Sequence, residues 1–210
     1  MADWVTISSL ATAGGTLVLA VATFSSVRSA NRSARVAERS LLAAQRPVLI
    51  PAREDDPAER VTFVDHALRV QGNGAVIEVF EGRVYMALAL RNGGSGLAVI
   101  HGWWVSADEQ RSAQERPDLD RFHRQQLDLY IPAGASGFWQ GAIRDPEDPS
   151  HGPLLDAAQN GLRIALDLLY GDHEGGQRTV ARFIMAPNEE SGGRSARVLR
   201  YWNIDREDPR

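Results

Sequence analysis

The chain begins with a run of 24 residues that carry no charge, from Trp4 to Val27. An α-helix rises about 1.5 Å per residue, so this run would be about 36 Å long, enough to cross a bilayer core of about 30 Å. Asp3 precedes the run, and arginines follow it closely. The pattern predicts one membrane-spanning helix over about residues 4–27, within a helical segment 1–46.

Four arginines follow the predicted span at intervals of four, three and four residues: Arg28, Arg32, Arg35 and Arg39. This spacing places them on one face of a continuing helix. We expect the helix to end at Arg46, because Pro47 disfavours helical geometry at the preceding residue. The basic face is expected to contact membrane lipid headgroups or acidic groups of a partner. The alternative is a topology signal on a solvated stalk.

The order of charged and apolar residues also predicts how the chain is inserted. A secretory signal peptide starts with positive charge and ends at a small-residue cleavage site, whereas this N-terminus holds Asp3 and no base. An arginine-rich flank stays in the cytoplasm under the positive-inside rule. We therefore expect an uncleaved single-pass protein of the cell inner membrane, with its N-terminus outside and residues 28–210 in the cytoplasm.

A seam of mostly small residues follows the helix in alternating steps of three and four. It comprises Thr6, Ser9, Ala13, Thr16, Ala20, Thr23, Val27, Ala30, Ala34, Ala37, Leu41 and Ala44. Such a seam lets helices pack closely, which predicts a homo-oligomer formed through the N-terminal helix. The alternative is chance, because small residues are common throughout this segment.

From Pro47 onward the sequence favours β-strands. Residues 162–168 alternate apolar and polar positions, the two-residue period of a half-buried strand. A loop over residues 171–177, rich in glycine, leads into a returning strand at 178–185. Residues 84–90 are apolar on both faces, as in a central strand. Further strands are predicted at 48–51, 61–70, 75–80, 97–105, 127–131, 137–142 and 197–202.

Many short strands with glycine-rich turns predict a mainly β fold, an antiparallel immunoglobulin-like β-sandwich over residues 47–205, followed by a frayed tail at 206–210. Two helical interruptions are expected, at 118–126 and at 153–159, the second with Pro153 at its start and Gly161 past its end. Four aromatic residues are expected in the core: Trp103, Trp104, Phe138 and Trp139.

Two short motifs carry a resemblance. Asn92-x-Gly94-x-Gly96-x-Ala98, followed by Tyr170-x-Asp172-x-x-Gly175, resembles uncharacterised bacterial proteins with one N-terminal span and an all-β domain. The resemblance covers the architecture of most of the chain. It implies the fold and carries no biochemical role.

Charge and composition exclude several functional classes. Residues 47–210 hold 18 arginines and 25 acids, a net charge of −7, which disfavours nucleic-acid binding through phosphate neutralisation. All 23 basic residues are arginine, as in GC-rich bacterial genomes, so lysine chemistry is excluded. The chain has no cysteine, which excludes disulfides and thiolate sites. No cofactor or metal site is predicted.

The polar side chains and glycines of two loops are candidates for chemistry, and an aromatic segment is a candidate for binding. Asp172, His173 and Glu174 place carboxylates around an imidazole, a pattern that binds a cation or transfers a proton; the alternative is a solvated turn. In the other loop, Asn92, Gly94 and Gly96 fit a turn or a small ligand-binding loop. The aromatic residues between Tyr130 and Trp139 would form a binding surface if exposed and core if buried.

These observations favour a non-enzymatic protein: a membrane-anchored cytoplasmic β-sandwich that binds a protein partner or scaffolds an assembly. One alternative is a membrane-tethered sensor of a small molecule or cation, using the loops 92–96 and 171–177. Another is a hydrolase whose site is assembled only in three dimensions. A sensor or enzyme requires a pocket with converging polar groups, whereas a scaffold predicts an exposed apolar patch or a free sheet edge.

Overall fold

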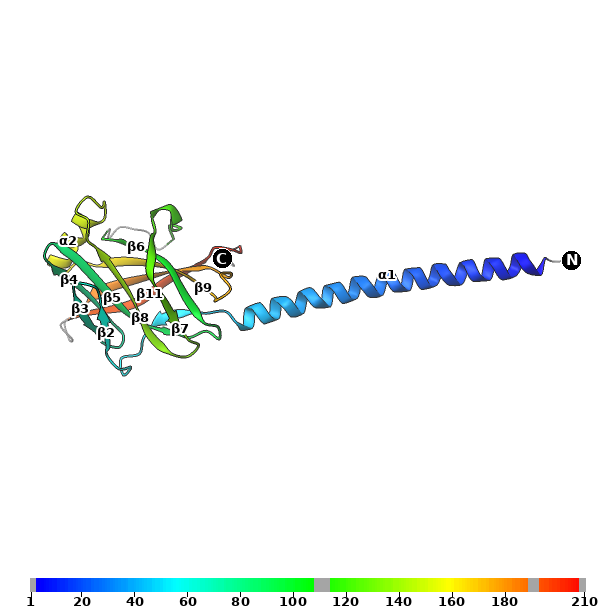
Figure 1. Ribbon diagram of the computed structural model, residues 1–210, viewed down its shortest axis with the longest axis horizontal. Helices are drawn as coiled ribbons and strands as arrows, with labels where there is room; N and C mark the ends of the chain where they lie inside the picture. The colour runs from blue at the N-terminus through cyan, green and yellow to red at the C-terminus, as the bar shows by residue number, and fades with distance from the viewer. Residues whose placement is uncertain (1–2, 108–113, 189–192, 208–210) are drawn as a thin grey trace. The chain divides into compact units, whose positions relative to one another are not determined.

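The computed structural model describes residues 3–107, 114–188 and 193–207. The chain divides into two compact units, residues 1–44 and residues 45–210. The first is the helix α1 and the second is mainly β, so a long N-terminal apolar helix and an all-β domain are both present (Figure 1). Each unit is described by itself.

Helix α1 (Trp4–Ala44) is one continuous helix of 41 residues. Its apolar part makes it the one helix in the described residues that is long and apolar enough to cross a membrane. The hydroxyls of Thr12 and Thr16 donate hydrogen bonds of 2.9 Å to the carbonyls of Ser8 and Thr12, four residues earlier. Polar side chains satisfied in this way are compatible with lipid. The helix ends at Ala44, two residues before the predicted end at Arg46.

The β unit begins with β1 (Leu49–Pro51) and the hairpin β2 (Glu59–Thr62) and β3 (Ala67–Val70). It continues through β4 (Gly74–Phe80), β5 (Arg83–Asn92), β6 (Ala98–Ser106), the 3₁₀ turn η1 (Leu119–Arg121), β7 (His123–Ile131) and β8 (Ser136–Ile143). Helix α2 (His151–Gln159) precedes the last three strands, β9 (Ile164–Gly171), β10 (Thr179–Pro187) and β11 (Arg194–Asn203).

Nine strands form one continuous antiparallel sheet that curls on itself (Figure 1). Its order is β1-β5-β4-β11-β10-β9-β6-β7, and β8 pairs with the other edge of β5. The hairpin β2–β3 is a separate two-stranded sheet. The mainly β, antiparallel fold is confirmed. The finer prediction of an immunoglobulin-like sandwich is not confirmed, because the nine strands share one hydrogen-bonded sheet.

The main core fills the inside of the curled sheet. Alternate residues of β9 supply Ile164, Leu166, Leu168 and Tyr170, as the two-residue period predicts. Helix α2 adds Leu154 and Ala157. A second apolar cluster lies between the β2–β3 hairpin and the opposite face of β5, and includes Val61, Leu68, Tyr85 and Ala87. The hairpin therefore covers the outer face of the sheet at β5.

The polar face of β9 is buried too, which the prediction of a half-buried strand did not foresee. Asp167 on β9 lies directly opposite Arg182 on β10, and both side chains are almost inaccessible to solvent. Arg182 Nε and Nη2 donate hydrogen bonds of 2.6 and 2.8 Å to the two carboxylate oxygens. The guanidinium also lies 4.7 Å from the ring of Trp202. A bidentate pair of this kind satisfies both buried charges.

Two predicted segments need correction. Residues 61–70 form the hairpin β2–β3 and not one strand, because the chain turns at residues 64–65 and the Phe63 N–H donates to the His66 carbonyl at 2.7 Å. The predicted helix at 118–126 is limited to the single turn η1, capped by the Asp118 side chain. From His123 onward the backbone pairs with β6, so tertiary pairing overrides the polar helical pattern.

The other element predictions are confirmed within a few residues at their ends. Gly161 follows α2 with a φ of +65°, the left-handed conformation that the predicted helix end requires. Trp103, Trp104 and Trp139 are buried, and Phe138 is partly buried against the second cluster. Of the predicted tail, residues 208–210 lie outside the described residues, whereas Arg206 is exposed.

Candidate functional site

The most distinctive surface of the β unit lies between β7 and β8. The loop of residues 132–135 joins these two strands, yet β7 pairs only with β6 and β8 only with β5 in the described part of the chain. The strands touch near the joining loop, where a Cβ at Gly137 would lie 3.1 Å from a side-chain carbon of Ile131. The sheet is therefore open along one line, with two unpaired strand edges facing each other.

Strand β7 also leaves its regular pairing with β6. The register passes from Ile100 opposite Leu129 to Gly102 opposite Arg124, so the four residues 125–128 lie opposite His101 alone. A bulge of this kind redirects side chains and weakens the ladder. As a result, five consecutive residues of β7, from His123 to Leu127, line the space between the strands.

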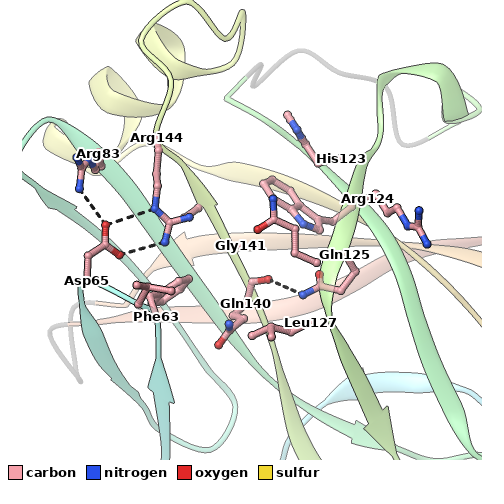
Figure 2. Close-up of a pocket in the computed structure, with 14 residues that line it drawn as sticks. Phe63, Asp65, Arg83, His123, Arg124, Gln125, Leu127, Gln140, Gly141 and Arg144 are labelled. Atoms are coloured by element: carbon pink, nitrogen blue, oxygen red, sulfur yellow. Dashed lines mark hydrogen bonds and ion pairs between the residues drawn. The ribbon is translucent and has the colours of Figure 1, made fainter.

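This space, which we name the seam cleft, has a volume of about 570 Å³. Residues 63–65 at the end of β2 form one side, β7 forms the other, and β8 lies between them (Figure 2). Its lining comprises Phe63, Val64, Asp65, Arg83, Trp103, His123, Arg124, Gln125, Gln126, Leu127, Gln140, Gly141, Ala142 and Arg144. Val64 is fully exposed and Leu127 is 53 % exposed, so the cleft presents apolar side chains to solvent.

Two tryptophans fill the interior of the curled sheet beneath the cleft. The rings of Trp103 and Trp139 meet edge-to-face at 5.4 Å, and His123 lies 4.5 Å from the Trp103 ring. A Cβ at Gly141 would lie 2.6 Å from the Trp139 ring and 2.9 Å from the Trp103 ring. Only glycine leaves room for both rings here. The Nε1 donor of Trp139 is buried and has no hydrogen-bond partner among the described residues.

Asp65 organises the arginines on one side of the cleft (Figure 2). Its carboxylate accepts hydrogen bonds from Arg83 Nη1 at 2.9 Å, from Arg144 Nη2 at 3.0 Å and from the Tyr85 hydroxyl at 2.7 Å. The hydrogen bonds from Arg144 and Tyr85 hold the pKa of Asp65 well below its ordinary value. The Asp65 contact in turn raises the pKa of Arg144. The cluster stays fully charged at neutral pH.

The seam cleft is cationic within an acidic unit. Its lining holds Arg83, Arg124 and Arg144 against the single carboxylate of Asp65, an excess of two positive charges when histidine is left out of the count. Residues 47–210 as a whole carry −7. Arg124 lies exposed on β7, and no described residue forms an ion pair with it. An anionic ligand is therefore favoured here more than elsewhere on the unit.

Two carboxamides line the cleft with hydrogen-bonding capacity to spare. Gln125 Nε2 donates to the backbone carbonyl of Gln140 at 3.4 Å, which is the one hydrogen bond between β7 and β8 among the described residues (Figure 2). The Oε1 atom of Gln125 is buried and has no partner among the described residues. Gln140 is only 6 % exposed, and within the described chain no hydrogen bond to its side-chain amide is recorded. Polar groups held in this way favour a ligand that both donates and accepts.

The predicted loop at 92–96 lies at the other end of the two strands, next to their joining loop. The Asn92 side chain accepts from the backbone N–H groups of Val48 and Gly94, and donates to the carbonyls of Gly96 and Ile131. A Cβ at Gly94 would lie 2.3 Å from the Arg46 carbonyl, and one at Gly96 only 1.7 Å from the Gln45 carbonyl. These contacts give the loop a structural role, holding the chain as it enters the β unit.

The predicted loop at 171–177 lies at the same end, because Gly171 pairs with Val99 at the start of β6. Asp172 is buried, and its carboxylate accepts hydrogen bonds from the Glu174 and Gly176 N–H groups and from the Gln177 amide. His173 and Glu174 are exposed. Asp172 thus shapes its own turn, and none of the three predicted residues lines the seam cleft. Ligand binding by either loop stays a prediction.

Neither the comparisons with known proteins nor a search for converging metal ligands assigns a site to the described residues. Comparison of the chain with protein-family models, with curated proteins and with solved structures gives no match. The N-terminal helix and the all-β domain are present, whereas the resemblance to single-span bacterial proteins itself stays a prediction. Among residues 3–107, 114–188 and 193–207, no group of three metal-ligating side chains converges.

Sequence reasoning found one part of the cleft region and missed the rest. Of the aromatic residues considered from Tyr130 to Trp139, Tyr130 is 54 % exposed on β7, Phe138 is partly buried and Trp139 is buried core. The polar stretch at 123–126 was expected to be helical, which hid the first four residues of β7. The predicted strand at 127–131 covers only the rest of β7, from Leu127 onward.

Proposed function

We propose that this protein is a membrane-anchored interaction module, in which α1 holds the β unit at the cytoplasmic face of the inner membrane and the seam cleft binds a protein partner. The observation that carries the proposal is the pair of unpaired strand edges, β7 and β8, facing each other across a cleft with exposed apolar side chains. Unpaired backbone groups at a sheet edge are a template for another strand.

The anchor supports this role through concentration. A binding unit tethered to a surface meets membrane-bound partners at a far higher effective concentration than one in solution. The basic face of α1 supports the proposed orientation, because Arg28, Arg32, Arg35 and Arg39 follow the uncharged stretch directly. The same face would contact anionic lipid headgroups.

The chemistry of the cleft supports binding more than hydrolysis. A general acid needs a carboxyl whose pKa is raised toward neutrality. The one carboxyl in the cleft, Asp65, has the opposite shift, because Arg144 and Tyr85 stabilise its ionised form. Its oxygens are also occupied by Arg83 and Arg144. A role as sensor through the loops 92–96 and 171–177 remains the alternative proposal.

Photocross-linking in the producing cells tests partner binding. A photoreactive amino acid replaces Leu127 in the cleft, and Leu199 on β11 serves as the matched exposed apolar control, 39 % exposed and outside the cleft. We expect a discrete adduct at position 127 that is absent at position 199 and is lost with Arg124→Glu. The same adducts at both positions, or none at 127, would contradict the proposed site.

Orientation is tested with single cysteines, because the chain has none of its own. We expect Leu199→Cys to react with a membrane-impermeant maleimide only after the cells are permeabilised. Asp3→Cys, on the far side of the span, is the matched control and should react in intact cells. Labelling of Leu199→Cys from outside would place the β unit on the opposite side of the membrane.

A further inference from the structure

We infer that the occupant of the seam cleft is an extended acidic segment of the partner, which adds as a β-strand along the open edges. The inference rests on the proposed function and specifies the chemistry of the partner. It is carried by three independent features of the cleft: its excess positive charge, its unpaired strand edges and its unpartnered carboxamide groups.

Charge complementarity selects an acidic segment. Arg83 and Arg144 share the Asp65 carboxylate, and about two fifths of each arginine side chain remains exposed at 40 % and 39 %. A guanidinium has five N–H donors, so each keeps donors for a second carboxylate. Arg124, on the opposite wall, has no ion-pair partner among the described residues. Carboxylates on an incoming segment would therefore meet cations on both sides of the cleft.

The strand edges select an extended backbone. The cleft follows five residues of β7, 123–127, and residues 140–142 of β8, with Arg144 just beyond the end of that strand. At about 3.3 Å per residue such a stretch is about 16 Å long, which fits a segment of about five residues. A helix presents no free backbone donors or acceptors along its side, so it cannot satisfy an open edge.

The side chains that line the seam cleft favour a segment in which acidic and apolar residues alternate. In a strand, successive side chains point in opposite directions. The cleft presents the apolar side chains of Phe63, Trp103 and Leu127 together with the arginines. A segment in which acidic and aliphatic residues alternate would place carboxylates toward the guanidiniums and apolar groups toward these rings. The carboxamides of Gln125 and Gln140 are then available to the segment's backbone.

Binding is measured with full-length protein in nanodiscs of zwitterionic lipid, so that the basic face of α1 attracts no anionic headgroup. The probe is a fluorescent nine-residue peptide of alternating Glu and Val. Three comparison ligands are the same peptide with Lys in place of Glu, the Glu–Val peptide with alternate backbone nitrogens methylated, and inorganic phosphate. Methylation keeps every side chain but removes the backbone donors that an added strand requires.

We expect the Glu–Val peptide to bind, and both the Lys and the methylated peptides to bind at least about tenfold more weakly. Arg124→Glu should weaken the Glu–Val peptide by about tenfold, and Arg124→Gln by about threefold. The matched control is Arg197→Glu on β11, an exposed arginine outside the cleft, which should change affinity less than about twofold.

Several results overturn the inference. If the Glu and Lys peptides bind equally well, charge does not select the ligand. If Arg197→Glu weakens binding of the Glu–Val peptide as much as Arg124→Glu does, the peptide does not bind in the cleft. If the methylated peptide binds as well and phosphate displaces it, the cleft is a small-anion site. An adduct at position 127 in cells without Glu–Val binding overturns the acidic segment and leaves the proposed function standing. If neither the adduct at position 127 nor Glu–Val binding is found, both the acidic segment and the proposed function are overturned.

Discussion

The β unit contains two kinds of ion pair between arginine and aspartate, one buried and one exposed. In the pair Asp167–Arg182 the side chains are at most 1 % exposed, each lies on a strand with neighbours on both sides, and two short hydrogen bonds fix the geometry. In the cluster of Asp65, Arg83 and Arg144 the carboxylate is shared by two arginines, and all three side chains reach solvent beside an open edge. The first arrangement satisfies its charges internally. The second leaves guanidinium donors free, which is the property a binding site needs.

The difference predicts that replacing Arg182 lowers the free energy of unfolding more than replacing Arg144 does. Arg182→Met leaves the Asp167 carboxylate buried without a counter-charge, and should lower the free energy of unfolding by about 3–5 kcal/mol. Arg144→Met is the matched control, and because solvent screens its partner it should cost less than about 1 kcal/mol. Urea unfolding of the β unit in the full-length protein measures both. Equal costs would contradict the distinction between a structural and a binding cluster.

Packing beneath the seam cleft gives the next largest effect. Gly141→Ala places a Cβ within 2.6 Å of the Trp139 ring and 2.9 Å of the Trp103 ring. Such overpacking should lower the free energy of unfolding by about 1–3 kcal/mol. At Gly152 in α2 nothing lies within 4 Å of the added Cβ, so Gly152→Ala is the matched control and should be neutral or stabilising. A neutral Gly141→Ala would show that the two rings do not close the floor as described.

The smallest effect concerns the pH dependence of Asp65. Hydrogen bonds from Arg144 and Tyr85 lower its pKa in the folded protein below the ordinary 3.8. The stabilisation it contributes is therefore present above pH 3.8 and is lost as the pH falls through the lowered value. Because the group is exposed, the effect should be small. Unfolding midpoints should fall less steeply in acid for Asp65→Asn than for the natural chain, and identical acid profiles would contradict the assigned pairing.

Regular alternation made part of the fold predictable. Residues 162–168 revealed β9 because one face of the strand meets the core at every second position. The second face was read as solvated, since nothing in β9 itself shows that Asp167 would meet Arg182 on the next strand. The hairpin β2–β3 was read as one strand because its turn, at Val64 and Asp65, interrupts the apolar pattern only briefly.

The candidate site was far less predictable. The seam cleft combines residues from the β2–β3 turn and from β5, β6, β7 and β8, and each arginine in it looks like an ordinary surface residue in its own segment. The loops that stood out, at 92–96 and 171–177, did so because of glycine and asparagine. The structure shows what those residues do: Gly94 and Gly96 admit the incoming chain, and Asp172 closes a turn.

Backbone amide hydrogen exchange tests the central claim, that β7 and β8 present open edges which a partner strand completes. In the free protein, residues 123–128 and 139–143 should exchange much faster than 164–170 and 179–185, whose strands have neighbours on both sides. Saturation with the Glu–Val peptide should slow exchange at residues 123–128 and 139–143 and leave exchange at 164–170 and 179–185 unchanged. The account would be contradicted if, in the free protein, the amides of 123–128 and 139–143 were as protected as those of β9 and β10. It would also be contradicted if the bound peptide left their exchange unchanged.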